Sequence, residues 1–126
     1  MTPDTLLLLR QIHPSFIQDG RVTSQAFRPT PKDEFLLSVD DGDRVSADAS
    51  WQRFIANPAC KSVGVQALSQ SECAAQELTV IEDGNPHPEH CSVDFTAFDK
   101  KAIEKKSKLL RAQAKTRGWL FRGAVA

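Results

Sequence analysis

The segment from Asn85 to Phe95, NPHPEHCSVDF, concentrates side chains that can bind metal or transfer protons. It contains two of the chain's three histidines, His87 and His90, and one of its three cysteines, Cys91. Histidine and cysteine are the usual zinc ligands, and histidine is also the commonest general acid or base. The segment is therefore a metal site, a catalytic corner, or a loop that leads into a strand.

The residues after His90 alternate between apolar and polar types, as in a half-buried strand. Successive side chains of a strand point to opposite faces, so Cys91, Val93 and Phe95 share the apolar face and Cys91 points away from His90. We therefore expect Cys91 to lie in the core. The polar face carries a histidine, a serine and an aspartate, which are triad residue types. They stand in parallel about 6.6 Å apart, too far for the convergent hydrogen bonds of a triad.

His87 and His90 alternate with prolines, which favour the polyproline II conformation with its three residues per turn. That conformation places the two imidazoles on one side, roughly 9 Å apart. Zinc needs a third protein ligand, and the chain offers only distant ones, such as His13, Cys60, Cys73 or a carboxylate. The sequence therefore predicts no metal centre, and it contains no motif that indicates a cofactor. We expect solvated loop histidines, with His90 hydrogen-bonded at the start of a strand.

Polar residues also interrupt the apolar strands near the N-terminus. Arg10 and His13 end an otherwise apolar strand, and Ser24 lies in the next one. Buried polar groups must be hydrogen-bonded, so edge strands with one solvated face explain these residues most simply. The alternative is a cleft in which Arg10, His13 and Ser24 meet His87 or His90, and in which the arginine binds a phosphate or carboxylate.

Such a cleft would make the chain a small transferase or hydrolase that acts on a phosphorylated or nucleotide-like substrate. Its candidate catalytic residues are Arg10, His13, Ser24 and His90. The chain contains no Walker loop, no GxGxxG and no GxSxG, so nucleotide use would lack its usual signature.

The charge of the chain is divided between two regions. Residues 1–99 hold 7 Lys and Arg against 15 Asp and Glu, whereas residues 100–126 hold 9 Lys and Arg against one acid. A formal net charge of zero thus combines an acidic body of −8 with a basic C-terminal segment of +8. This asymmetry points to an interaction through the basic segment.

The basic segment is predicted to be a helix over about residues 97–117. It is rich in good helix formers, and a glycine follows Arg117, where a helix commonly ends. At 100° per residue, Ile103 and Leu110 lie on the buried side. Lys106 and Arg117 fall at its middle, and we expect them to snorkel or to pair with acids of the body. The opposite side carries a basic stripe, which consists of Lys101, Lys105, Lys108, Arg111 and Lys115.

Three uses of the basic stripe are open. It is a solvated helix face, or it binds an acidic protein or the acidic body of a second copy, or it binds nucleic acid. Nucleic acid is less favoured because the acidic body repels a phosphate backbone and no aromatic residues are interleaved with the lysines. The preferred hypothesis is a protein-interaction or regulatory module that binds an acidic partner, or itself, through this helix. The cleft enzyme is the alternative.

The remaining pattern predicts an α+β fold with a single mixed or antiparallel sheet of about six or seven strands and two main helices. Ser46 is a fitting N-cap for the first helix, over residues 46–57, and a short helical turn is expected at 69–72. Strands are expected over residues 5–13, 21–27, 35–39, 62–68, 78–81 and 91–95, with a short one at 119–121.

Length and composition indicate a cytoplasmic protein. The 126 residues suit one domain spanning residues 1–126. No apolar run approaches the roughly 18 residues of a membrane span, and no signal peptide is recognised, so no membrane partner is expected. The cysteines are odd in number and have no CxxC spacing, which is typical of reduced thiols in the cytoplasm.

The segments RQIHPSFIQDGRVTSQAF, LSV and NPHPEHCSVDF resemble those of small bacterial proteins of about this length that carry no assigned activity. The resemblance covers much of residues 10–95 and implies no fold, cofactor or catalytic residue. A strand-borne arginine or histidine followed by a polar strand is also similar to ADP-ribosyltransferases, although no matching glutamate motif is present.

Overall fold

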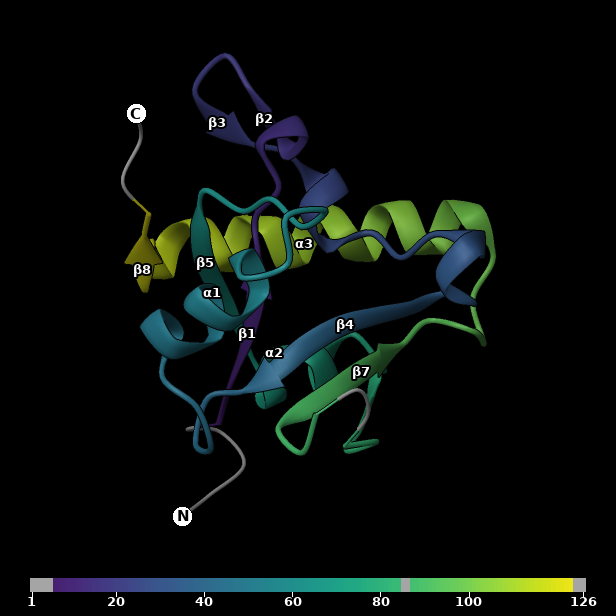
Figure 1. The fold of residues 1–126 in the computed structure, drawn as a ribbon. Helices are drawn as coiled ribbons and strands as arrows, with labels where there is room; N and C mark the ends of the chain where they lie inside the picture. The colour runs from purple at the N-terminus through teal and green to yellow at the C-terminus, as the bar shows by residue number, and fades with distance from the viewer. Residues whose placement is uncertain (1–5, 85–86, 124–126) are drawn as a thin grey trace.

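The computed structural model of the chain describes residues 6–84 and 87–123. Six antiparallel strands form the main sheet in the order β6-β7-β4-β1-β5-β8, and two short strands form a separate hairpin (Figure 1). The main strands are β1 (Leu7–Gln11), β4 (Leu36–Asp41), β5 (Gly64–Ser69), β6 (Thr79–Ile81), β7 (His90–Asp94) and β8 (Phe121–Arg122). The hairpin strands are β2 (Ile17–Gln18) and β3 (Arg21–Val22), and the helices are α1 (Ala47–Ile55), α2 (Gln70–Ala75) and α3 (Lys100–Arg117). The predicted α+β fold, with one antiparallel sheet and two main helices, is confirmed.

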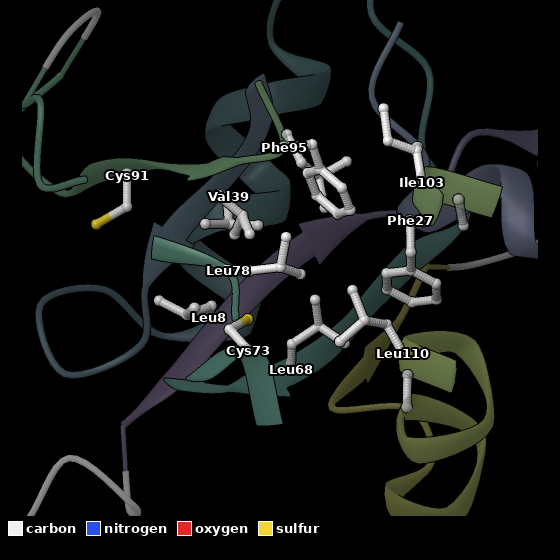
Figure 2. Close-up of a cluster of buried hydrophobic side chains, with 14 of the residues drawn as sticks. Leu8, Phe27, Val39, Leu68, Cys73, Leu78, Cys91, Phe95, Ile103 and Leu110 are labelled. Carbon is white, nitrogen blue, oxygen red and sulfur yellow. The ribbon is translucent and has the colours of Figure 1, made fainter. Parts of the chain in front are cut away.

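Helices cover both faces of the sheet. Neighbouring residues of β1 point to opposite faces, so Leu8 and Leu9 pack into different clusters. Leu8 belongs to the larger core, in which the sheet packs against α3 and its Leu110 (Figure 2). Leu9 belongs to a smaller cluster that packs against Trp51 of α1. Helix α1 contacts chiefly β1, β5 and β8, so it covers mainly that half of its face of the sheet. None of the described helices has the length and apolar character needed to cross a membrane.

The apolar face of β7 lies in the larger core, as the alternation predicted. Cys91 is 2% exposed, and Val93 and Phe95 are fully buried. Burial raises the pKa of the Cys91 thiol to about 11 and that of Cys73, in α2, to about 12. Both thiols are therefore protonated at neutral pH and act as small apolar core residues.

Arg117 ties the end of α3 to α2 and β5. Its Nη1 donates to the Ala67 carbonyl at 2.8 Å and to Glu72 Oε1 at 3.0 Å, while Nη2 donates to Glu72 Oε2 at 2.9 Å. Glu72 also accepts from the Ser69 N–H and so closes a capping box at the start of α2. Burial favours the neutral carboxyl, but the hydrogen bonds from Arg117 and Ser69 outweigh it, so the pKa of Glu72 lies below its ordinary value. Of the two alternatives expected for Arg117, snorkelling or pairing with an acid of the body, the structure shows the pairing.

The strand predicted over residues 21–27 is wrong beyond its first two residues. Only Arg21–Val22 is extended, and Ser24–Phe27 forms a 3₁₀ helix, η3. Its last two residues are both fully buried, whereas adjacent residues of a strand would point to opposite faces. The tighter turn directs both toward the core, where Ser107 of α3 donates to the Phe27 carbonyl at 3.1 Å.

The start of the last helix also differs from the predicted residue 97. Helix α3 begins at Lys100, because the Asp99 carboxylate accepts from the Ala102 N–H at 2.8 Å and acts as the N-cap. The first long helix follows its prediction closely, with Ser46 as the confirmed N-cap.

Candidate functional site

A cleft of about 650 Å³ lies between β1 and β4. The two strands diverge from each other in Figure 1. These strands are paired only at Leu8 and Leu9 of β1, beyond which β1 continues beside β5 and β4 beside β7. Arg10 spans the opening, since its Nε donates to the Ala26 carbonyl at 2.7 Å and its Nη1 to the Ser38 carbonyl at 3.0 Å. The cleft is thus a consequence of the diverging sheet, and Arg10 contributes hydrogen bonds across the gap.

The charged side chains that line this cleft are mostly cationic. Of the described residues, Arg10, Arg53 and Lys61 face it together with one carboxylate, that of Asp40. Residues 1–99 as a whole carry a net charge of −8, so the lining departs strongly from the charge of the body. Such a local excess of positive charge attracts anionic ligands. Two phenylalanines and two aliphatic side chains supply an apolar part of the wall.

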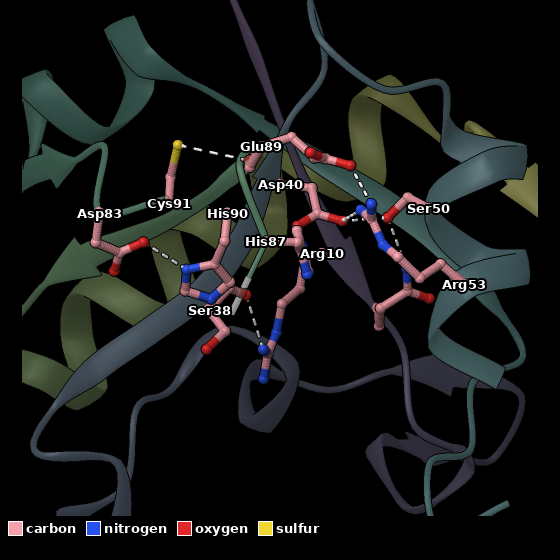
Figure 3. Close-up of polar contacts among 11 residues, drawn as sticks. Arg10, Ser38, Asp40, Ser50, Arg53, Asp83, His87, Glu89, His90 and Cys91 are labelled. Carbon is pink, nitrogen blue, oxygen red and sulfur yellow. Dashed lines mark hydrogen bonds and ion pairs between the residues drawn. The ribbon is translucent and has the colours of Figure 1, made fainter. Parts of the chain in front are cut away.

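Asp40 of β4 holds the first of two histidines in the cleft. His87 Nε2 lies 2.8 Å from Asp40 Oδ1, and Asp40 Oδ2 accepts from Ser50 Oγ at 2.6 Å and from Arg53 Nη2 at 3.3 Å (Figure 3). The Asp40 side chain is only 12% exposed, so these contacts take place largely out of solvent. A carboxylate held from three sides fixes the orientation of the imidazole that it contacts.

Arg53 is itself committed to ion pairs. It pairs with Glu89 as well as with Asp40. Burial lowers the pKa of Arg53, but the hydrogen bond and charge of Glu89 and the charge of Asp40 outweigh it and raise that pKa. The hydrogen bond from Arg53 lowers the pKa of Glu89. Both groups therefore stay charged at neutral pH, and Arg53 acts mainly to hold Asp40 in place.

Asp83 holds the second histidine. His90 Nδ1 lies 2.6 Å from Asp83 Oδ1 (Figure 3). Asp83 Oδ2 accepts from Ser92 Oγ at 2.6 Å. A carboxylate beside Nδ1 requires a proton on that nitrogen, so the neutral imidazole carries its lone pair on Nε2. In His87 the carboxylate lies beside Nε2, and the lone pair is on Nδ1. Each ring thus keeps one nitrogen that makes no hydrogen bond to the residues that the structure describes.

The two imidazoles contact each other, with ring centroids 5.6 Å apart and planes at 82°. The predicted polyproline II conformation of this segment is wrong, because a turn closes with a hydrogen bond of 3.0 Å from the His90 N–H to the His87 carbonyl. Pro88 follows His87 in the turn, a position that suits its fixed φ. The turn brings the rings closer than the extended segment would. Asn85 and Pro86 lie outside the described residues.

The four candidate catalytic residues are not brought together as a group. Arg10, His13 and His90 line the cleft, whereas Ser24 lies in η3 and does not. Their contacts go to other groups: Arg10 donates to the backbone carbonyls of Ala26 and Ser38, His13 Nδ1 lies 2.8 Å from Ser15 Oγ, and His90 Nδ1 lies beside Asp83. Ser24 was predicted to lie in a strand that lines the cleft, but it lies in the 3₁₀ helix η3 and does not line the cleft.

The sequence interpretation missed the two carboxylates that hold the histidines. Asp40 is the residue opposite His90 in the ladder between β4 and β7, and in the sequence it comes directly after the strand predicted over residues 35–39. Period-two alternation from Ser38 places Asp40 on the same polar face, and this signal was present in the sequence. Asp83 lies in the loop between β6 and β7, and no local pattern distinguishes it from other loop acids.

Histidine, cysteine and carboxylate side chains can also bind metal ions when several lie close together. Within residues 6–84 and 87–123, no three His, Cys, Asp or Glu side chains are grouped so that they can hold a metal ion.

The basic stripe lies on the outer side of α3. Its four lysines are exposed, whereas Arg111 is half-buried and its Nε donates to the Val22 carbonyl at 2.8 Å. Arg111 therefore contributes to the docking of the β2–β3 hairpin. Binding of an acidic partner by the lysines stays a prediction.

Comparison of the chain with models of known protein families, with curated proteins and with solved structures found no match.

Proposed function

We propose that the chain is a small cytoplasmic hydrolase or transferase that acts on a phosphorylated substrate by general acid–base catalysis. The observation that carries the proposal is the pair of imidazoles in one cleft, His87 with Asp40 and His90 with Asp83, at a centroid distance of 5.6 Å. The cleft also favours an enzyme over a pure interaction module, which would need no cleft of this size.

A carboxylate behind an imidazole prepares it for proton transfer. It fixes the tautomer and orientation of the ring and stabilises the imidazolium that forms when the ring takes up a proton. Two such rings can serve opposite roles in one displacement. One accepts the proton of the attacking hydroxyl as its oxygen bonds to phosphorus, and the other donates a proton to the leaving oxygen as its bond to phosphorus breaks.

The rest of the cleft suits direct attack on a phosphate ester. No serine or cysteine in the described part of the chain is hydrogen-bonded to His87 or His90, which favours attack by water or a substrate hydroxyl over a covalent enzyme intermediate. Lys61 is exposed at the cleft and makes no hydrogen bond to a described residue, so it can contact the phosphate oxygens.

A panel of phosphate compounds tests this function. We expect the purified chain to turn over at least one of three classes: phosphomonoesters, phosphodiesters including cyclic nucleotides, and nucleoside diphosphates. Phosphate release and chromatography of the products are the measurements. The Lys101→Gln variant, altered on the outer face of α3, is the control and should match the wild type. Turnover of carboxylic esters alone, or of no compound at all, would contradict the proposal.

A further inference from the structure

A second cleft, of about 470 Å³, adjoins the one that holds the histidines. Its walls come from η3, from the segment that follows it and from the start of β4. Four residues line both clefts: Arg10, Ser15, Phe16 and Ser38. Because the lining is shared, one ligand can extend from the histidines past the half-buried Phe16 ring into the second cleft.

Arg28 gives the second cleft its chemical character. The residue is half-buried, and its Nε is sealed from solvent without a hydrogen-bond partner among the described residues. A guanidinium is charged at every accessible pH, and a buried N–H without an acceptor is costly. A bound anion would satisfy both the charge and the missing hydrogen bonds.

The surroundings of Arg28 strengthen this interpretation. Among the described residues, the charged side chains that line the second cleft are Arg10 and Arg28, with no Asp or Glu. Arg10 already donates to the carbonyls of Ala26 and Ser38. Arg28 is therefore the cation in this cleft that lacks an acceptor in the described part of the protein.

We propose that Arg28 binds a second phosphate group of the substrate. The substrate is then a molecule with two phosphate groups joined by an apolar or aromatic body that lies along Phe16, as in a nucleoside bisphosphate. This inference rests on the proposed function for the phosphate at the histidines, but the anion site at Arg28 stands on its own contacts.

Titration with inorganic phosphate separates the two sites. In the ¹⁵N-labelled full chain, the Nε–H signal of Arg28 reports the second cleft, and the ring signals of His87 and His90 report the first. We expect saturable shifts at both, and in Arg28→Gln the histidine shifts should persist. Shifts at Arg28 without histidine shifts would support the anion site and contradict the proposed function. Histidine shifts without a response at Arg28 would overturn the inference.

Calorimetry with two nucleotides tests the two-phosphate substrate. Adenosine 3′,5′-bisphosphate should bind about 10- to 100-fold more tightly than adenosine 5′-monophosphate, because a charge-assisted hydrogen bond is added. Arg28→Gln should abolish this difference. Arg122→Gln, which alters an exposed arginine of β8 at the far edge of the sheet, should preserve it. Equal affinity of the wild type for both nucleotides would refute the second phosphate site.

Discussion

Replacing His90 with glutamine should lower kcat for the phosphate ester that the chain turns over by about 10²- to 10⁴-fold, the usual contribution of a general acid or base. Glutamine keeps a polar side chain of similar reach but cannot exchange a proton. The substrate KM should change little, because the imidazole acts in the transition state and contributes little to ground-state binding. Steady-state kinetics of product formation over a range of substrate concentrations measures both constants.

His87→Gln should have an effect of the same order, because the second ring supplies the opposite proton transfer. The double variant should lose less than the product of the two single losses, since the rings act as a unit. His13→Gln is the matched control. His13 also lines the cleft, but its Nδ1 is occupied by Ser15, and no carboxylate in the described part of the chain pairs with it. A His90→Gln enzyme with the kcat of His13→Gln would show that the pair does not transfer protons.

Arg117→Met should destabilise the fold by about 2–3 kcal/mol. Removing one partner of a buried ion pair typically costs about 3–5 kcal/mol, and this pair retains some solvent, with Arg117 25% and Glu72 18% exposed in their side chains. The variant leaves the Glu72 carboxylate without its cation and the Ala67 carbonyl without that donor. Equilibrium unfolding in urea measures the loss. Lys115→Met, at an exposed position in the last turn of the same helix, should change stability by less than about 0.5 kcal/mol.

The same pair should make stability depend on pH in the acid range. The pKa of Glu72 is lower in the folded chain than in the unfolded one, so the unfolded state binds the proton more readily. The contribution of Glu72 is then present above the ordinary pKa of a glutamate and is lost as pH falls through the lowered value. In Arg117→Met this part of the acid destabilisation should shrink. An unchanged slope would show that Arg117 does not stabilise the ionised carboxyl.

Most of the fold was predictable from local patterns in the sequence. The alternation after His90 predicted the buried face of β7, and capping residues located α1 and the end of α3. The strand prediction for residues 21–27 was wrong because a 3₁₀ helix buries two adjacent side chains there. Such burial produces no regular alternation of apolar and polar residues in the sequence. Propensity for a strand was outweighed there by packing against α3.

The candidate site was predictable only in part, because its geometry depends on contacts far apart in the sequence. A cleft lined by Arg10 and His90 was predicted from the sequence as the alternative to solvated edge strands. The carboxylate that holds His87 is 47 residues away from it, and it is placed by the antiparallel register between β4 and β7. The close approach of the His87 and His90 rings accompanies a turn hydrogen bond between these two residues. The neighbouring prolines in the sequence did not predict this turn.

The tautomers of the histidines test the central claim most directly. Long-range ¹H–¹⁵N spectra of the imidazoles, recorded where the rings are neutral, distinguish a proton on Nδ1 from one on Nε2. We expect His90 to be the Nδ1–H tautomer, because Asp83 accepts from that nitrogen, and His87 to be the Nε2–H tautomer, because Asp40 accepts there. Added inorganic phosphate should then shift the unprotonated nitrogens of both rings and leave His13 unchanged. Rings that average between tautomers, or that ignore phosphate, would contradict a cleft built for proton transfer.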